Sequence, residues 1–135
     1  MKKIISAILI IFLNSCALIP TKPNENITGH NNSIYITGYE VFEIKSPHFC
    51  YFFISTCVSC ESIKAKIEVY ATEHMNFYMI EAPLSYQKGI TKDDSIGAKR
   101  MEDIKFLGFP TLIYIENNTL TKMYVGINEI TNILF

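Results

Sequence analysis

The stretch Phe49–Cys60, which reads FCYFFISTCVSC, carries the clearest structural pattern in this sequence. Its first half, Phe49–Ile54, is a continuous apolar run rich in aromatic residues, and such runs are typical of a strand that is buried on both faces. Its second half holds two cysteines, Cys57 and Cys60, separated by Val58-Ser59. The stretch therefore predicts a central strand that leads directly into a closely spaced cysteine pair.

A helix is predicted directly after the cysteine pair, over Glu61–Glu73. Its apolar residues recur at the spacing of one helical face: Ile63, Ile67, Tyr70 and Ala71. Either Ser55 or Thr56 can cap the helix, because a hydroxyl accepts hydrogen bonds from the unpaired N–H groups of a first turn. A second apolar run, Met75–Ile80, predicts another strand, and a strand–helix–strand unit of this length implies parallel pairing.

The second half of the chain predicts a loop over Glu81–Lys92 and then a helix. Asp93 or Asp94 is expected to cap that helix, which should run to about Lys105. Its inward-facing residues are expected to be Ile96, Met101 and Ile104. Gly108-Phe109-Pro110 would end it, because proline lacks the N–H group that a continuing helix needs.

The C-terminal part predicts a hairpin followed by a short helix over Asn128–Leu134. Its strands, Thr111–Ile115 and Thr119–Val125, flank a turn at Asn117-Asn118. Near the other end, alternating apolar residues in 33–45 suggest one or two short strands. The sequence as a whole predicts an α/β fold with a central mixed β-sheet flanked by helices.

The position of the cysteine pair favours thiol chemistry. The first turn of a helix has unpaired N–H groups and the positive end of the helix dipole, which stabilise a thiolate and so lower the pKa of Cys57. Cys57 precedes the helix and should be the more exposed sulfur, whereas Cys60 should be more buried. Cys60 is placed to attack a mixed disulfide formed on Cys57 and release the partner. A zinc site is not predicted, because it needs about four ligands and the sequence has no second closely spaced cysteine pair.

The chain resembles the thioredoxin-like superfamily at four places. They are Tyr51-Phe52-Phe53, Cys57-Val58-Ser59-Cys60, Gly108-Phe109-Pro110-Thr111 and Gly126. The resemblance implies a thioredoxin fold over residues 34–135, with catalytic cysteines and an internal redox-active disulfide as the only redox group. It also implies that Pro110, which precedes the strand led by Thr111, is cis and packs against the disulfide. Phe109 would then offer backbone hydrogen bonds to an extended substrate.

Four departures from thioredoxin itself are present, and those at the cysteine pair leave the direction of the reaction open. Thr56 stands where the family has a tryptophan, and Tyr51 stands where it has a buried acid that helps deprotonate the second cysteine. Val58-Ser59 replaces Gly-Pro and brings no cation or imidazole to the pair. The stretch between Cys60 and Pro110 is also longer than in thioredoxin, and the extra residues fall in Glu81–Lys92.

The N-terminus predicts export. Lys2 and Lys3 precede an apolar run that is too short to span a bilayer, and Leu13-Asn14-Ser15-Cys16 resembles the lipobox of bacterial lipoproteins. Residues 1–15 are therefore predicted to be a lipoprotein-type signal peptide, with Cys16 as the acylated N-terminus and 16–33 as a flexible linker. An uncleaved anchor or cleavage elsewhere is the alternative, and either would still place the domain outside the cytoplasm.

Composition excludes two further classes of protein. With 49% hydrophobic and 19% charged residues, the chain is not a low-hydrophobicity disordered polymer. Its formal net charge of −1 comes without a basic stripe, so sequence-independent nucleic-acid binding is not expected. The expected partners are exported proteins with thiols or disulfides, a membrane or extracellular redox partner, and the membrane itself through the lipid.

The leading interpretation is an extracytoplasmic, lipid-anchored bacterial thiol–disulfide oxidoreductase that uses the CVSC pair. A narrower form is an accessory protein for bacteriocins or other secreted disulfide-containing peptides. The alternative is a lipid-anchored binding module without redox turnover, which holds Cu(I) on Cys57 and Cys60 or presents its surface to a partner. Two other residues have two interpretations each. Cys50 is either a third redox thiol or a packed apolar residue, and His48 is either a proton carrier or a surface residue.

Overall fold

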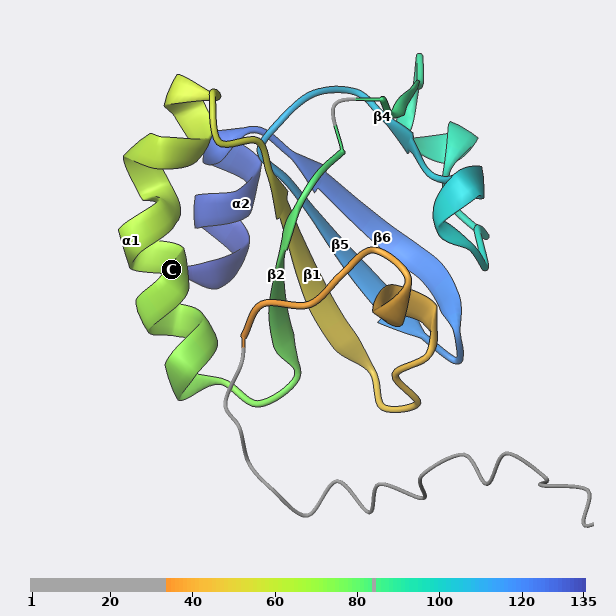
Figure 1. Ribbon diagram of the computed structural model, residues 1–135, viewed down its shortest axis with the longest axis horizontal. Coiled ribbons are helices and arrows are strands. Elements are labelled where there is room, and N and C mark those ends of the chain that lie inside the picture. Colours follow the sequence, from red (N-terminus) through yellow and green to blue (C-terminus); the bar gives the residue numbers. More distant parts are fainter. Residues whose placement is uncertain (1–33, 84) are drawn as a thin grey trace, which may run out of the picture. The chain divides into compact units, whose positions relative to one another are not determined.

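The computed structural model describes residues 34–83 and 85–135, so the predicted signal peptide and linker lie outside the described residues. A four-stranded sheet has the order β2-β1-β5-β6 (Figure 1). Its strands are β1 (His48–Phe53), β2 (Phe77–Glu81), β5 (Thr111–Glu116) and β6 (Thr119–Val125). β1 is parallel to β2 and antiparallel to β5, and β5 is antiparallel to β6. The predicted mixed sheet is confirmed, with the buried aromatic strand at its centre.

Two helices, α1 (Val58–Glu73) and α2 (Ile127–Leu134), cover one face of the sheet (Figure 1). Their buried residues join one apolar core cluster: Cys60, Ile63, Ile67, Ala71 and Ile130. The predicted helical face of α1 is thus confirmed, but its predicted start and cap are wrong. Cys57 is the capping residue, since its sulfur accepts a hydrogen bond from the backbone N–H of Cys60 at 3.1 Å. The helix therefore begins at Val58 rather than at Glu61.

The opposite face is covered by irregular chain in place of α-helices. It carries five short elements: η1 (Glu40–Phe42), β3 (Gln87–Lys88), η2 (Lys92–Asp94), η3 (Met101–Asp103) and β4 (Lys105–Phe106). Residues from this chain and from the sheet form a second core cluster, which includes Val41, Cys50, Phe52, Ile104, Phe106, Ile113 and Leu120. Because β1 alternates between the two clusters, both of its faces are apolar, as its continuous aromatic run predicted.

The helix predicted from Asp93 or Asp94 to Lys105 is wrong. Gly97 has a φ of 94°, and its N–H donates to the Leu120 carbonyl at 2.8 Å, while the Leu120 N–H donates to the Ala98 carbonyl at 2.8 Å. The Ser95 hydroxyl also bonds to the N–H and the carbonyl of Lys105, at 2.7 and 2.9 Å. These bonds draw the segment along the outer edge of β6, so Ile96 is exposed rather than inward-facing.

The strands suggested for residues 33–45 are reduced to one isolated bridge. The Met79 N–H donates to the Ile34 carbonyl at 2.6 Å, and the Ile36 N–H donates to the Met79 carbonyl at 3.1 Å. The chain then turns into η1, so the apolar alternation does not continue as a strand. The bridge nevertheless occupies the outer edge of β2 at Met79.

Candidate active site

The two cysteines of the CVSC motif form a disulfide at one end of the strands of the sheet. β1 and β2 end here and β5 begins here, because Phe52 is paired with Ile80 on one side and with Thr111 on the other. The Cα atoms of Cys57 and Cys60 are 5.2 Å apart. The pair therefore lies where the predicted central strand meets the helix that follows it.

The helix start holds the two sulfurs in unequal environments. Cys57 is half-buried, whereas Cys60 is 1% exposed, which confirms the predicted difference between them. Val58 and Ser59 face solvent, and the side chain of Val58 is 84% exposed. In the reduced protein, the hydrogen bond from the Cys60 N–H and the helix dipole would both stabilise a thiolate on Cys57.

The loop before β5 faces the disulfide. The peptide bond between Phe109 and Pro110 is cis, and the Phe109 carbonyl oxygen lies 3.7 Å from the Cys57 sulfur. Pro110 is buried, and its carbonyl accepts a hydrogen bond from the Gly126 N–H at 2.8 Å. The Thr111 hydroxyl donates to the Gly108 carbonyl at 2.6 Å. These two bonds fix the loop from both sides and bring the three predicted residues, Phe109, Pro110 and Thr111, to one site.

Tyr51 lies on the buried side of the cysteine pair. Its hydroxyl points at the Cys60 carbonyl, at 3.5 Å. Burial, with a smaller contribution from the charge of Glu61, raises the pKa of Tyr51 far above its usual value, so the hydroxyl is protonated at neutral pH. Among the residues that the structure describes, no carboxylate is buried. The buried acid that the resemblance to thioredoxin would place at this position is thus replaced by a neutral hydroxyl.

Two candidate residues do not reach the site. Cys50 belongs to the core cluster on the other face of the sheet, where burial raises the pKa of its thiol; it is a packed apolar residue. His48 lies at the opposite end of β1 and is 1% exposed, so its interpretation as a surface residue is wrong. Its ring nitrogens lie 2.7 Å from the Ser46 carbonyl and 2.8 Å from the Val41 carbonyl, which explains its burial.

An aromatic cluster beside the disulfide was missed from the sequence. The ring of Phe109 packs against Tyr86 with a centroid distance of 4.8 Å and against Phe106 with a distance of 5.1 Å. Phe109 contacts the core clusters on both faces of the sheet. Tyr86 falls in the loop predicted over Glu81–Lys92, and Phe106 falls directly after the predicted helix, which ends at about Lys105. The one clue in the sequence is Tyr86, an aromatic residue between Ser85 and Gln87-Lys88.

The described part of the chain has no group of three or more His, Cys, Asp or Glu side chains placed to hold a metal ion. Within the same residues, no helix is both long enough and apolar enough to cross a bilayer.

This mixed sheet, with a disulfide at the start of α1 and a cis-proline loop facing it, is a thioredoxin-like fold. No protein-family model and no curated protein matches the sequence. Thioredoxin f from spinach chloroplast (short form) matches with a TM-score of 0.50 and 13% identity, over 74% of this chain and 88% of that one. Thioredoxin o2 from Arabidopsis thaliana, in its oxidised state, matches with a TM-score of 0.50 and 13% identity, over 77% and 92%. At this identity, the similarity shows the fold alone.

Proposed function

We propose that this protein is an extracytoplasmic thiol–disulfide oxidoreductase that is lipid-anchored through Cys16 and acts on exported proteins. The observation that carries the proposed chemistry is the half-buried Cys57, whose sulfur caps α1 and lies 3.7 Å from the carbonyl oxygen of Phe109. A helix N-terminus lowers the pKa of a thiol, and a second cysteine on the first turn completes a two-electron couple.

The reduced pair would act in two steps. The Cys57 thiolate attacks a client disulfide, so that one client sulfur leaves as a thiolate and a mixed disulfide forms. Cys60 loses its proton and attacks the Cys57 sulfur, which releases the second client sulfur and leaves the Cys57–Cys60 disulfide. Two electrons and two protons pass from the pair to the client, and the same steps in reverse oxidise a client dithiol.

The direction is set by the reduction potential of the pair relative to its redox partner. Val58 and Ser59 bring no charge to the sulfurs, and Tyr51 is a protonated hydroxyl in place of a carboxylate. Neither feature fixes the reduction potential of the Cys57–Cys60 pair. That potential can be measured by equilibration with glutathione. A potential near that of strong oxidants would fit disulfide formation in secreted peptides, which is the narrower accessory role.

The activity is tested with the full-length chain in detergent micelles, using reduction of insulin disulfides by dithiothreitol. We expect Cys57→Ser to lower the rate to that of dithiothreitol alone, because the attacking sulfur is lost. Cys60→Ser should accumulate a mixed disulfide with the client, detectable by mass spectrometry. Cys50→Ser is the matched control and should keep the wild-type rate. Turnover that survives Cys57→Ser would contradict the proposal, and Cu(I) binding without any turnover would favour the binding module.

The anchor is tested separately from the chemistry. In a bacterial host, the mature chain should begin at Cys16 and carry the mass of a lipid on that residue. Cys16→Ser should abolish the lipid and release the protein from the membrane fraction. An unmodified Cys16 in a membrane-bound chain would instead indicate an uncleaved anchor, without bearing on the cysteine pair.

A further inference from the structure

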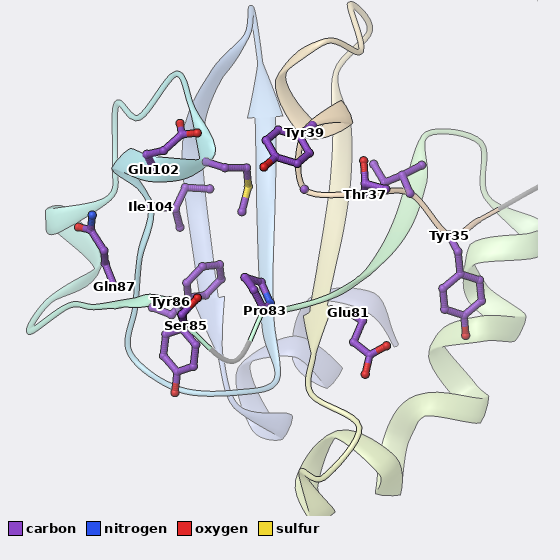
Figure 2. Close-up of a pocket in the computed structure, with 14 residues that line it drawn as sticks. Tyr35, Thr37, Tyr39, Glu81, Pro83, Ser85, Tyr86, Gln87, Glu102 and Ile104 are labelled. Carbon is purple, nitrogen blue, oxygen red and sulfur yellow. The ribbon is translucent and has the colours of Figure 1, made fainter.

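The irregular side of the domain contains a cavity of about 740 Å³. This volume lies within the range of pockets that bind ligands. Three segments that are distant in sequence line it: residues 35–39, residues 81–87 except 82 and 84, and residues 101–106 except 103 and 105 (Figure 2). The cavity is thus built by the irregular chain that replaces helices on this face.

Aromatic rings and a thioether form much of the cavity wall. They belong to Tyr35, Tyr39, Tyr86, Phe106 and Met101. Figure 2 shows Pro83 between Tyr86 and Glu81, with Tyr39 above them in this view. Tyr39 is 83% exposed, so its ring is accessible to a ligand. The face of an aromatic ring carries negative electrostatic potential and attracts Lys and Arg side chains.

The charged residues of the lining are all acidic. Glu81 and Glu102 line the cavity, whereas none of its lining residues is Lys, Arg or His. Figure 2 shows the two glutamates towards opposite ends of the cavity. Among the described residues, neither makes an ion pair or a side-chain hydrogen bond. The nearby cation Arg100 is paired with Asp103 at 3.0 Å, and the charge of Glu102 is the smallest of the causes that raise its pKa. Neither Glu81 nor Glu102 is therefore held in an ion pair with a described residue, and both carboxylates can attract an external cation.

Residues of the cavity wall connect it to the loop that faces the disulfide. Glu81 ends β2 opposite Phe53, at the end of the sheet where the cysteine pair lies, and the Ala82 N–H donates to the Phe53 carbonyl at 2.8 Å. Tyr86 and Phe106 line the cavity and also pack against Phe109. The half-buried rings of Tyr86 and Phe109, which contact each other, therefore link the cavity wall to the loop that faces Cys57.

We propose that this cavity binds a segment of the client that carries Lys or Arg among apolar residues and lies close to the client's reactive cysteine. The inference rests on the proposed oxidoreductase function and names the class of client. The apolar side chains would pack against the aromatic wall and the thioether. The cationic groups would lie over the ring of Tyr39 and near Glu81 and Glu102.

The test compares two disulfide-bridged peptides that differ only in the flanking segment, Lys/Arg with Leu in one and Glu with Leu in the other. With the full-length chain, we expect kcat/KM to be about fivefold higher for the basic peptide, mainly through a lower KM. Glu81→Gln combined with Glu102→Gln should reduce this preference to less than about twofold. Tyr39→Leu, which keeps apolar area but removes the ring, should reduce it partly.

Controls separate the cavity from the chemistry. Glu116→Gln removes an exposed carboxylate at the opposite end of the sheet, so the preference should remain. Reduction of glutathione disulfide should be the same in all these variants. Equal kcat/KM for the two peptides, or a preference that survives the double substitution, would overturn the inference.

A second arm uses the same two peptides with every cysteine replaced by serine and measures binding by calorimetry. Tighter binding of the basic peptide supports the cavity assignment even if no peptide is reduced, in which case the oxidoreductase proposal alone fails. Equal binding overturns the cavity assignment even where turnover is normal.

Discussion

The two faces of the central sheet are covered in different ways. On one face, α1 and α2 bury residues at regular helical spacing, including Ile63, Ile67 and Ala71. On the other face, irregular chain is held by individual hydrogen bonds, such as those of Gly97 and Ser95, and it encloses the cavity. The disulfide lies at the helical face, and its aromatic surroundings extend to the irregular one.

The two faces meet two different requirements of the site, which are fixed positions for the sulfurs and space for a client segment. A helix end holds the two sulfurs in fixed geometry, because its backbone hydrogen bonds do not depend on the identity of most side chains. The irregular face can form a cavity, because no continuous helical surface fills the space beside the sheet. We expect the chemistry to depend on the first face and client selection on the second.

Loss of a buried isoleucine should be more costly under the helices than beside the cavity. Ile67→Ala should lower the free energy of unfolding by about 3 kcal/mol, whereas Ile104→Ala should lower it by about 2 kcal/mol. Both side chains are almost fully buried, but Ile104 already borders open space and so loses fewer contacts. Denaturant unfolding followed by circular dichroism, with the disulfide intact, measures both. Equal costs would mean that the two faces are packed alike.

Replacing a glycine should lower stability more in the irregular segment than in the loop beside the disulfide. At Gly97, with a φ of 94°, Gly97→Ala should be destabilising by about 1 kcal/mol even though the added methyl group would meet open space. Gly108→Ala is the control, since its methyl group also meets nothing and its φ is not positive. It should be neutral or stabilising by about 0.5 kcal/mol. Thermal unfolding compares the two, and similar shifts in both would refute a backbone origin.

The smallest expected effect concerns the ion pair that joins the irregular segment to α2. Lys92 donates to Glu129 at 2.7 Å, and this bond, followed by the Val125 N–H, lowers the pKa of the Glu129 carboxyl. Because the pKa is lower in the folded state than in the unfolded state, the ionised carboxyl stabilises the fold at any pH above its unfolded-state pKa. This stabilisation is lost as the pH falls through the folded-state pKa. Glu129→Gln should therefore cost about 0.5 kcal/mol at pH 7 and almost nothing in strong acid.

The matched control for this pH dependence is Glu116→Gln. Glu116 makes no ion pair with another described residue, so its replacement should change stability little at either pH. Denaturant midpoints at the two pH values provide the comparison. A cost for Glu129→Gln that is the same in acid as at neutral pH would show that the ion pair is not its source.

Regular periodicity in the sequence predicted the helical face and the sheet. The aromatic run gave β1, the helical spacing gave α1, and the Asn117-Asn118 turn lies between β5 and β6 as predicted. The cis bond before Pro110 followed from the resemblance to the superfamily.

The irregular face could not be predicted from local pattern. Its path depends on bonds between distant residues, such as Gly97 with Leu120, and a propensity for helix over residues 93–105 does not contain that information. The burial of His48 depends on the carbonyl of Val41 in η1 and on that of Ser46, which lies between η1 and β1. The cavity requires three separate segments to meet, so no single stretch of sequence indicates it.

The two edge strands of the sheet, β2 and β6, are each partly covered by irregular chain. The backbone N–H and carbonyl of Met79 on β2 are hydrogen-bonded to Ile34 and Ile36. Those of Leu120 on β6 are hydrogen-bonded to Ala98 and Gly97. An unpaired edge strand is a template on which another copy can add a strand and aggregate. Irregular chain thus protects both margins of the sheet at these points against self-association.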